Sequence, residues 1–288
     1  MTTKHSSQGI LLMILSCACF TAAWIGIKFL TPRLPLIEII FFRGFISLIC
    51  LIPLVYRRVG SFSASNYGSL FYRSSFGVAA MFLHFYALKN IDIGNAAALV
   101  NTAPIFVAIL SPFILGERFR RQSFFLIVMA FIGACFILKP NSHVISTGAL
   151  SALGGGFFAA LAMIYIRKLH GSDSSTTIAF YFTLMATLSG LPMIMHFVWP
   201  TPLEWGVLLG TGMIITAAQL AMTKAYAHGE ASLIAPFNYV SVIFSYAVGM
   251  IFWKDIPDRW SLLGAAVIVA SGVGIMLAGK KAKTFQLE

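Results

Sequence analysis

Three basic residues lie inside long apolar stretches of the sequence, where an ionisable side chain is unusual. Arg43 lies about seven residues, or roughly 10 Å along a helix, from the start of the apolar stretch 36–56. Lys28 and Arg73 lie closer to the ends of theirs. An ionised side chain within a bilayer costs about 3 kcal/mol or more unless it is paired or hydrated. Arg43 therefore fits either an anion or carboxylate contact in a cavity, or a structural link to Glu38 or to a broken helix end.

The other charged residues near these interiors have simpler interpretations. Glu38 is a carboxylate close to the end of its stretch, which favours a loop contact over a role in proton coupling. Lys28 has a counterpart in Arg167, which also ends an apolar stretch, and this favours an interfacial anchor. Arg73 fits snorkelling to the surface and gating equally well.

Two further stretches combine proline with polar residues at mid-helix positions. One contains Asn101 and Pro104, and the other contains Pro236, Asn238 and Tyr239. Proline frees a backbone carbonyl that another group must satisfy, so helices kink or break there beside a cavity. We therefore predict a substrate site here, with hinges at Pro104 and Pro236; kinks that serve only packing are the alternative. Further candidates for lining the site, each also a common packing residue, are Trp24, His84, Tyr165 and Gln219.

The composition indicates that these residues lie in a membrane. Hydrophobic residues make up 59% of the chain and charged residues 10%, against about 25% charged in soluble domains. The mean hydropathy is +0.87. The net charge of +11 is spread in short clusters between apolar stretches, which is typical of topology signals facing lipid headgroups. A nucleic-acid partner would require one continuous basic face, so we predict none.

Ten stretches of about 20 mostly apolar residues follow one another with short loops between them. They are 9–30, 36–56, 68–88, 94–115, 122–139, 147–167, 175–198, 204–224, 231–253 and 260–279. The sequence therefore predicts an all-α integral membrane protein with ten transmembrane helices.

The two halves of the chain match at a nearly constant offset. Pro53 matches Pro192 at an offset of 139 residues, and Asp92 matches Glu230 at 138. We predict two five-helix repeats, residues 1–140 and 141–288. Because five is odd, the second repeat enters the membrane from the opposite side. Inverted repeats are characteristic of many secondary transporters, with the substrate site between them.

Loop charges predict the orientation. The loops on the side of the N-terminus hold most of the basic residues, which indicates that both termini are cytoplasmic. Small residues repeat every four positions on several helices and let backbones approach closely. Such faces on the fifth and tenth helices would permit a homodimer.

The sequence offers no catalytic constellation. It has no HExxH, GxSxG or nucleotide-binding motif, so we predict no catalytic residue and no ATP-driven pump. The four cysteines lack the spacing of a metal or redox pair: Cys17, Cys19, Cys50 and Cys135. We therefore expect no metal and no cofactor, and transport driven by a gradient or by exchange.

Four segments carry a resemblance to a known family: Phe41-Phe42-Arg43, 85–118, 225–240 and 255–275. They combine Tyr-Ala-Leu, an Ala-rich helix with a proline, a Gly-Glu loop and a Gly-rich last helix. The chain resembles the drug/metabolite transporter superfamily in its ten-helix, two-repeat EamA-like branch, over nearly its whole length. The resemblance implies a carrier that moves small organic metabolites by alternating access through a central cavity, with both termini cytoplasmic.

The branch is similar to carriers of S-adenosylmethionine and of riboflavin, whereas other members export amino acids or drugs. Arg43 and the segment 236–239 look like the S-adenosylmethionine type, but Asn238 stands where those carriers have Arg. The resemblance thus implies a small-molecule substrate and an inner (cytoplasmic) bacterial membrane. A non-transporting membrane scaffold and a membrane-embedded enzyme are the alternatives of another class.

Overall fold

The computed structural model describes the backbone of residues 2–59, 63–115, 121–138, 146–169, 172–227 and 235–284. This part of the chain is helical almost throughout, which confirms the predicted all-α fold. The helices are α1 (Thr2–Leu30), α2 (Leu36–Val59), α3 (Tyr67–Asn90), α4 (Ile93–Val100), α5 (Ala103–Leu115), α6 (Arg121–Leu138), α7 (Thr147–Leu169), α8 (Ser175–Gly190), η1 (Leu191–His196), α9 (Pro202–Ala227), η2 (Ala235–Tyr239), α11 (Val240–Phe252) and α12 (Arg259–Thr284).

Every predicted apolar stretch corresponds to a helix or to two consecutive helical pieces. Among the described residues, five spans are long and apolar enough to cross a membrane: Gln8–Leu30, Leu36–Arg57, Thr147–Ile166, Thr176–His196 and Pro202–Met222. Shorter apolar helices cover Ile93–Val107, Phe125–Ile137, Phe237–Phe252 and Arg259–Gly274. The remaining helix, α3, is long but less apolar because it carries Arg73, Ser74 and His84.

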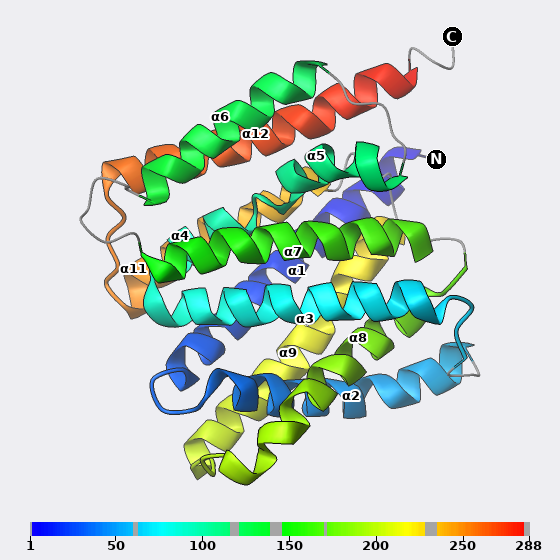
Figure 1. The fold of residues 1–288 in the computed structure, drawn as a ribbon, viewed down its shortest axis with the longest axis vertical. Helices are drawn as coiled ribbons and strands as arrows, with labels where there is room; N and C mark the ends of the chain where they lie inside the picture. Colours follow the sequence, from blue (N-terminus) through cyan, green and yellow to red (C-terminus); the bar gives the residue numbers. More distant parts are fainter. Residues whose placement is uncertain are drawn as a thin grey trace.

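The helices pack in a pattern that exchanges the two halves of the chain (Figure 1). By its place in each half, α1 corresponds to α7 and α3 corresponds to α9. Helix α1 packs on α9 and α3 packs on α7, whereas α2, α4 and α6 pack on their own counterparts α8, α11 and α12. A two-fold relation between five-helix halves requires this pattern, so the two-repeat fold is confirmed. The boundary predicted at residues 140 and 141 lies outside the described residues and stays a prediction.

The start of α1 and the end of α12 lie at the same end of the bundle (Figure 1). The connections from α2 to α3 and from α7 to α8 are at this end too. We call it the inner end, following the orientation predicted from the loop charges. The opposite end, with residues 31–35 and 197–201, is called the outer end.

Two ion pairs join the halves of the chain at the outer end. Lys28 Nζ lies 3.3 Å from Asp255 Oδ2, and Arg33 pairs with Glu204. Asp255 follows Lys254, a non-glycine residue with a left-handed φ of 57°. This conformation costs about 1 kcal/mol or more, and it lets the chain turn after α11 so that Asp255 reaches Lys28. Lys28 is therefore held by the protein, in place of the interfacial anchoring expected from the sequence.

Glu38 adds a third link at the outer end. Its Oε2 accepts a hydrogen bond of 2.8 Å from the backbone N–H of Val198, and its side chain is buried. The loop contact expected for Glu38 is thus confirmed. Since this carboxylate binds the loop before α9, the structural link from Arg43 to Glu38 is not formed.

Helices α6 and α12 approach closely through glycine. A Cβ at Gly264 would lie 2.5 Å from the carbonyl oxygen of Gly133, and a Cβ at Gly133 would lie 2.8 Å from that of Gly264. Neither position has room for a side chain, because the obstacle is backbone. The small faces of the fifth and tenth predicted helices are therefore used within the chain, and the homodimer stays a prediction.

Replacing Gly264 with alanine should destabilise the protein by about 1–3 kcal/mol, as overpacking does in other cores. Thermal unfolding in detergent measures the effect. The matched control is Gly210→Ala, because a Cβ at Gly210 meets nothing within 4 Å and alanine favours a helix. Equal melting temperatures for the two variants would contradict the close α6–α12 contact.

Candidate functional site

Five helices surround the interior of the bundle between the two ends. Helix α1 packs on α3 and α9, α2 packs on α8 and α9, and α3 packs on α8. These contacts form a closed ring to which both halves of the chain contribute. Side chains from three of its helices meet in what we call the central cluster, composed of Trp24, Arg43, Met81, His84 and Phe85.

Arg43 is the charged member of the central cluster. Its side chain is buried, with Nη2 2.7 Å from the sulfur of Met81 and Cζ 5.6 Å from the centre of the Phe85 ring. The buried Nε has no hydrogen-bond partner among the described residues. A thioether is a weak acceptor and an aromatic ring offers only its face, so neither neutralises a guanidinium. The charge is therefore left for a ligand or for water.

His84 and Trp24 form the polar and aromatic side of the cluster. Their ring centres are 4.8 Å apart in an edge-to-face arrangement. Both ring nitrogens of His84 are buried and lack a hydrogen-bond partner in the described part of the chain. A neutral imidazole has one donor and one acceptor, so His84 can offer both to a bound molecule.

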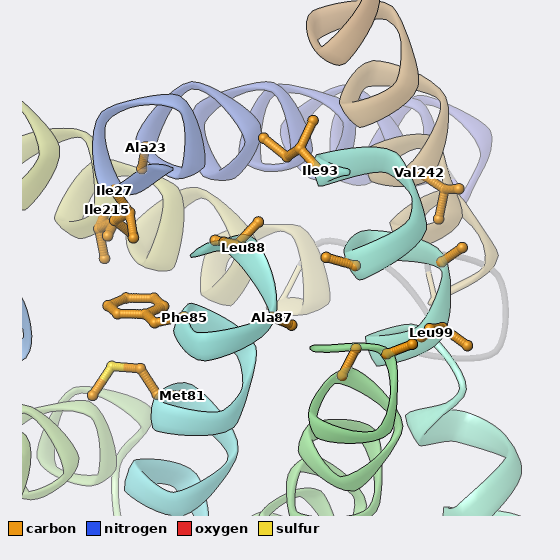
Figure 2. Packing of buried hydrophobic residues seen from close by; sticks show 14 of the residues in the cluster. Ala23, Ile27, Met81, Phe85, Ala87, Leu88, Ile93, Leu99, Ile215 and Val242 are labelled. Carbon is orange, nitrogen blue, oxygen red and sulfur yellow. The ribbon is translucent and has the colours of Figure 1, made fainter. Parts of the chain in front are cut away.

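Met81 and Phe85 complete the cluster and were not predicted from the sequence. Figure 2 shows both projecting from α3 toward the same side, with Ile27 and Ile215 beside Phe85. Their spacing of four residues places them on one helix face, and this signal is present in the sequence. What the sequence cannot give is that Arg43, from another helix, lies against them.

A second group of polar residues lies where the two interrupted helices meet. Helix α4 ends before Asn101, and Asn101 Nδ2 donates to the carbonyl of Ala97 at 2.8 Å and to Ser241 Oγ at 3.3 Å. Ser241 Oγ donates in turn to the carbonyl of Asn238 at 2.7 Å. The structure thus joins the two predicted breaks through Ser241, which the sequence analysis did not name. These side chains add hydrogen bonds to backbone carbonyls at both breaks; the carbonyl of Ala97 also accepts the backbone N–H of Asn101 at 3.0 Å.

The other residues of the second break face different neighbours. Asn238 Oδ1 lies 3.7 Å from Cys17 Sγ of α1. Tyr239 is buried against α12, where a Cβ at Gly272 would overlap its hydroxyl group. The backbones of Pro104 and Pro236 belong to α5 and η2, and their side chains lie outside the described residues.

Two predicted site residues, Tyr165 and Gln219, are not members of the central cluster. Tyr165 stacks on Tyr72 with ring centres 5.4 Å apart, and Tyr72 is 50% exposed, so this pair lies toward the outside of the bundle. Gln219 is half-buried on α9, next to Ala218, whose carbonyl accepts a hydrogen bond from Ser16 of α1. Among the described residues, no group of three or more His, Cys, Asp or Glu could hold a metal ion.

Comparison with known proteins finds relatives along nearly the whole chain. It is 33% identical over 272 residues to a pseudopaline exporter of Pseudomonas aeruginosa, covering 93% of this chain and 95% of the relative. It is 28% identical to a riboflavin transporter of Vibrio cholerae, covering 93% and 92%. It is 26% identical to an S-adenosylmethionine uptake transporter of Rickettsia prowazekii, covering 99% and 98%.

A solved crystal structure of another protein shares the fold. It has a TM-score of 0.68 and 17% sequence identity, covering 96% of this chain and 99% of that one. The family model described as the EamA-like transporter family matches residues 7–139 and again residues 146–277, once in each half. With its two-repeat helical fold and its relatives among membrane transporters, the chain belongs to the EamA-like transporter family.

Proposed function

We propose that this protein is a secondary transporter that moves a small organic metabolite bearing an anionic group across the membrane by alternating access. The observation that carries the proposal is the buried Arg43, which has no carboxylate partner among the described residues. A buried charge without a partner is strongly unfavourable in a low-dielectric interior. A carboxylate on the substrate would offset that cost through charge-assisted hydrogen bonds.

The remaining members of the central cluster favour an amphipathic substrate. Trp24 and Phe85 present aromatic surface beside Arg43 and His84, so a flat or apolar part of the substrate can pack there while its polar groups bind. S-adenosylmethionine combines a carboxylate with an adenine ring and fits this description. Pseudopaline, named for a relative of this chain, belongs on the same panel of candidates, and riboflavin, named for another relative, is included as a compound without an anionic group. Amino-acid or drug export on the same fold is the alternative.

Alternating access requires the two ends to open in turn. At the outer end, the pairs Lys28–Asp255 and Arg33–Glu204 tie the halves together. At the inner end, a cavity of about 300 Å³ is lined by Tyr67, Leu70, Phe71, Ser74, Tyr181 and Met185. We take this arrangement as the state closed on the outside. With both termini in the cytoplasm of a bacterial cell, the outer end would face the periplasm.

Counterflow in proteoliposomes should detect transport of at least one candidate. Vesicles are preloaded with unlabelled S-adenosylmethionine, pseudopaline, riboflavin or an amino acid, and uptake of the same labelled compound is measured. Arg43→Met keeps a long apolar side chain but removes the charge, so it should slow uptake at least about thirtyfold, corresponding to ~2 kcal/mol for a lost buried charge contact. Arg259→Met, at an exposed arginine stacked on Trp260, is the control and should transport normally.

If the protein is folded and none of these compounds exchanges, the proposal that it transports one of them would be contradicted. A membrane scaffold makes a different prediction, because its function should survive Arg43→Ala and Asn101→Ala unchanged. A transporter should lose transport in Arg43→Ala at normal levels of folded protein.

Weakening the Lys28–Asp255 pair should expose the central cluster to the outside. In a background with the native cysteines replaced by alanine, His84→Cys reports access to a membrane-impermeant maleimide added outside. Asp255→Asn should speed labelling about fivefold, as expected for ~1 kcal/mol from a partly exposed pair. Lys254→Gln removes the neighbouring charge but leaves the pair intact, and it should not change the rate. Unchanged labelling in Asp255→Asn would argue against this pair as the outer gate.

A further inference from the structure

A second arginine, Arg73, lies on α3 between the inner end and the central cluster. It is about six residues, or roughly 9 Å, beyond the start of α3. Helical side chains lean toward the helix N-terminus, which here is the inner end, so a snorkelling arginine would point back to the surface. The guanidinium instead lies beside Gly77, one turn further along the helix, where a Cβ would be 2.8 Å from Arg73 Nη1.

The guanidinium of Arg73 is also unpaired. Its Nε and Nη1 are buried and have no hydrogen-bond partner among the described residues. Its Cζ lies 4.2 Å from the centre of the Phe182 ring. Neither α3 nor α8 contains an Asp or Glu, and Asp173, just before α8, accepts hydrogen bonds from Ser65 and Ser172. An aromatic face stabilises a cation but leaves its N–H groups unsatisfied.

Arg73 and the central cluster are connected along one face of α3. Residues 73, 77, 81 and 85 are spaced by four, so they follow one another on the same face. Eight residues separate Arg73 from Met81, the contact of Arg43, which is about 12 Å along the helix. Only Gly77, without a side chain, lies between them on this face. The two unpaired guanidinium groups therefore lie one after the other along the axis of α3, from the inner end toward the centre of the bundle.

The inner-end cavity reaches the same level of α3. Ser74, the neighbour of Arg73, lines this cavity of about 300 Å³. Its hydroxyl group is buried and has no hydrogen-bond partner within the described chain. Tyr181 and Met185 of α8 also line the cavity. They precede and follow Phe182 in the chain, and the ring of Phe182 lies against the Arg73 guanidinium. The cavity is thus lined by the residue that follows Arg73 and by the one that precedes Phe182 in the chain, while Arg73 and Phe182 themselves do not line it.

We propose that Arg73 is a second anion-binding station, which takes the carboxylate or phosphate group of the substrate between the inner end and Arg43. This inference rests on the proposed transport function and assigns a second contact to the anionic group of its substrate. The anion would contact Arg73 as it enters or leaves the inner end, and Arg43 in the centre. Gly77 is required between the stations because a side chain there would displace the guanidinium.

The direct test uses the arginine Nε–H signals in NMR spectra of the full chain, labelled at arginine, in maltoside micelles that contain no phosphate. Inorganic phosphate is the probe, and Arg43→Lys and Arg73→Lys assign the two signals. Both signals should shift with phosphate. Arg73→Met, which keeps the apolar contact with Phe182, should abolish the Arg73 response and leave that of Arg43. Arg259→Met should change neither, and the remaining arginine signals report whether each variant is folded.

Gly77→Ala offers a second variant that retains both charges. Its Cβ would lie 2.8 Å from Arg73 Nη1 and 2.9 Å from Phe182 Cε2, so the guanidinium must move. The phosphate concentration that gives half of the Arg73 shift should then rise at least tenfold. Gly210→Ala, where a Cβ meets open space, should leave this concentration unchanged. An unchanged response in Gly77→Ala would overturn the position proposed for the station.

The outcomes separate this inference from the proposed function. A shift at Arg43 without one at Arg73 would overturn the second station and leave transport through Arg43 standing. A shift at Arg73 that appears only when anionic phospholipid is added to the micelles would mark a lipid site and overturn the station for substrate. If neither signal shifts, both the proposal of a second station and the proposal that the substrate is anionic would be overturned. For a compound found to be transported, Arg73→Met should raise at least tenfold the concentration that gives half-maximal transport when the compound is supplied at the inner end. An unchanged concentration would overturn the station.

Discussion

The lack of hydrogen-bonding solvent inside a bilayer is the constraint on which the rest of this structure depends. It requires every backbone polar group to find a partner within the protein, so the chain crosses as helices and can interrupt them only where other protein groups lie nearby. The breaks beside Asn101 and Asn238 meet this requirement together, because Asn101 and Ser241 bind each other and a backbone carbonyl on each side. These two breaks therefore lie where helices of the two halves meet.

The same constraint explains where the charges are. At the outer end, Lys28 and Arg33 each have a carboxylate partner from the other half of the chain. In the interior, Arg43 and Arg73 have aromatic rings and a thioether as neighbours but no carboxylate among the described residues. Paired charges hold a structure together, whereas unpaired buried charges are unfavourable until something binds them. The paired charges therefore lie at the outer end, and the unpaired arginines lie in the interior.

The fold repeats itself, but its chemistry does not. At the offset of 139 residues, Arg43 corresponds to Phe182 and Arg73 corresponds to Gly212. Phe182 supports the guanidinium of Arg73, and a Cβ at Gly212 would lie 2.6 Å from Ile46 of α2. Both interior arginines thus come from the first repeat; Arg73 lies against Phe182 of the second repeat, whereas Arg43 lies against Met81 and Phe85 of its own. The two repeats thus share a fold but differ in the residues they place in the interior.

The sequence by itself determined the ten helices and the two repeats, because apolar stretches of spanning length and a constant offset are local or linear properties of the chain. It also located the interrupted helices and identified Arg43 as unusual. Only the tertiary structure decided that Arg43 lies on Met81 and Phe85, that Tyr165 stacks toward the outside, and that Lys28 pairs with Asp255. These contacts join residues from different helices, and the rotation of each helix about its axis is set by its packing against all its neighbours, which no stretch of sequence specifies alone.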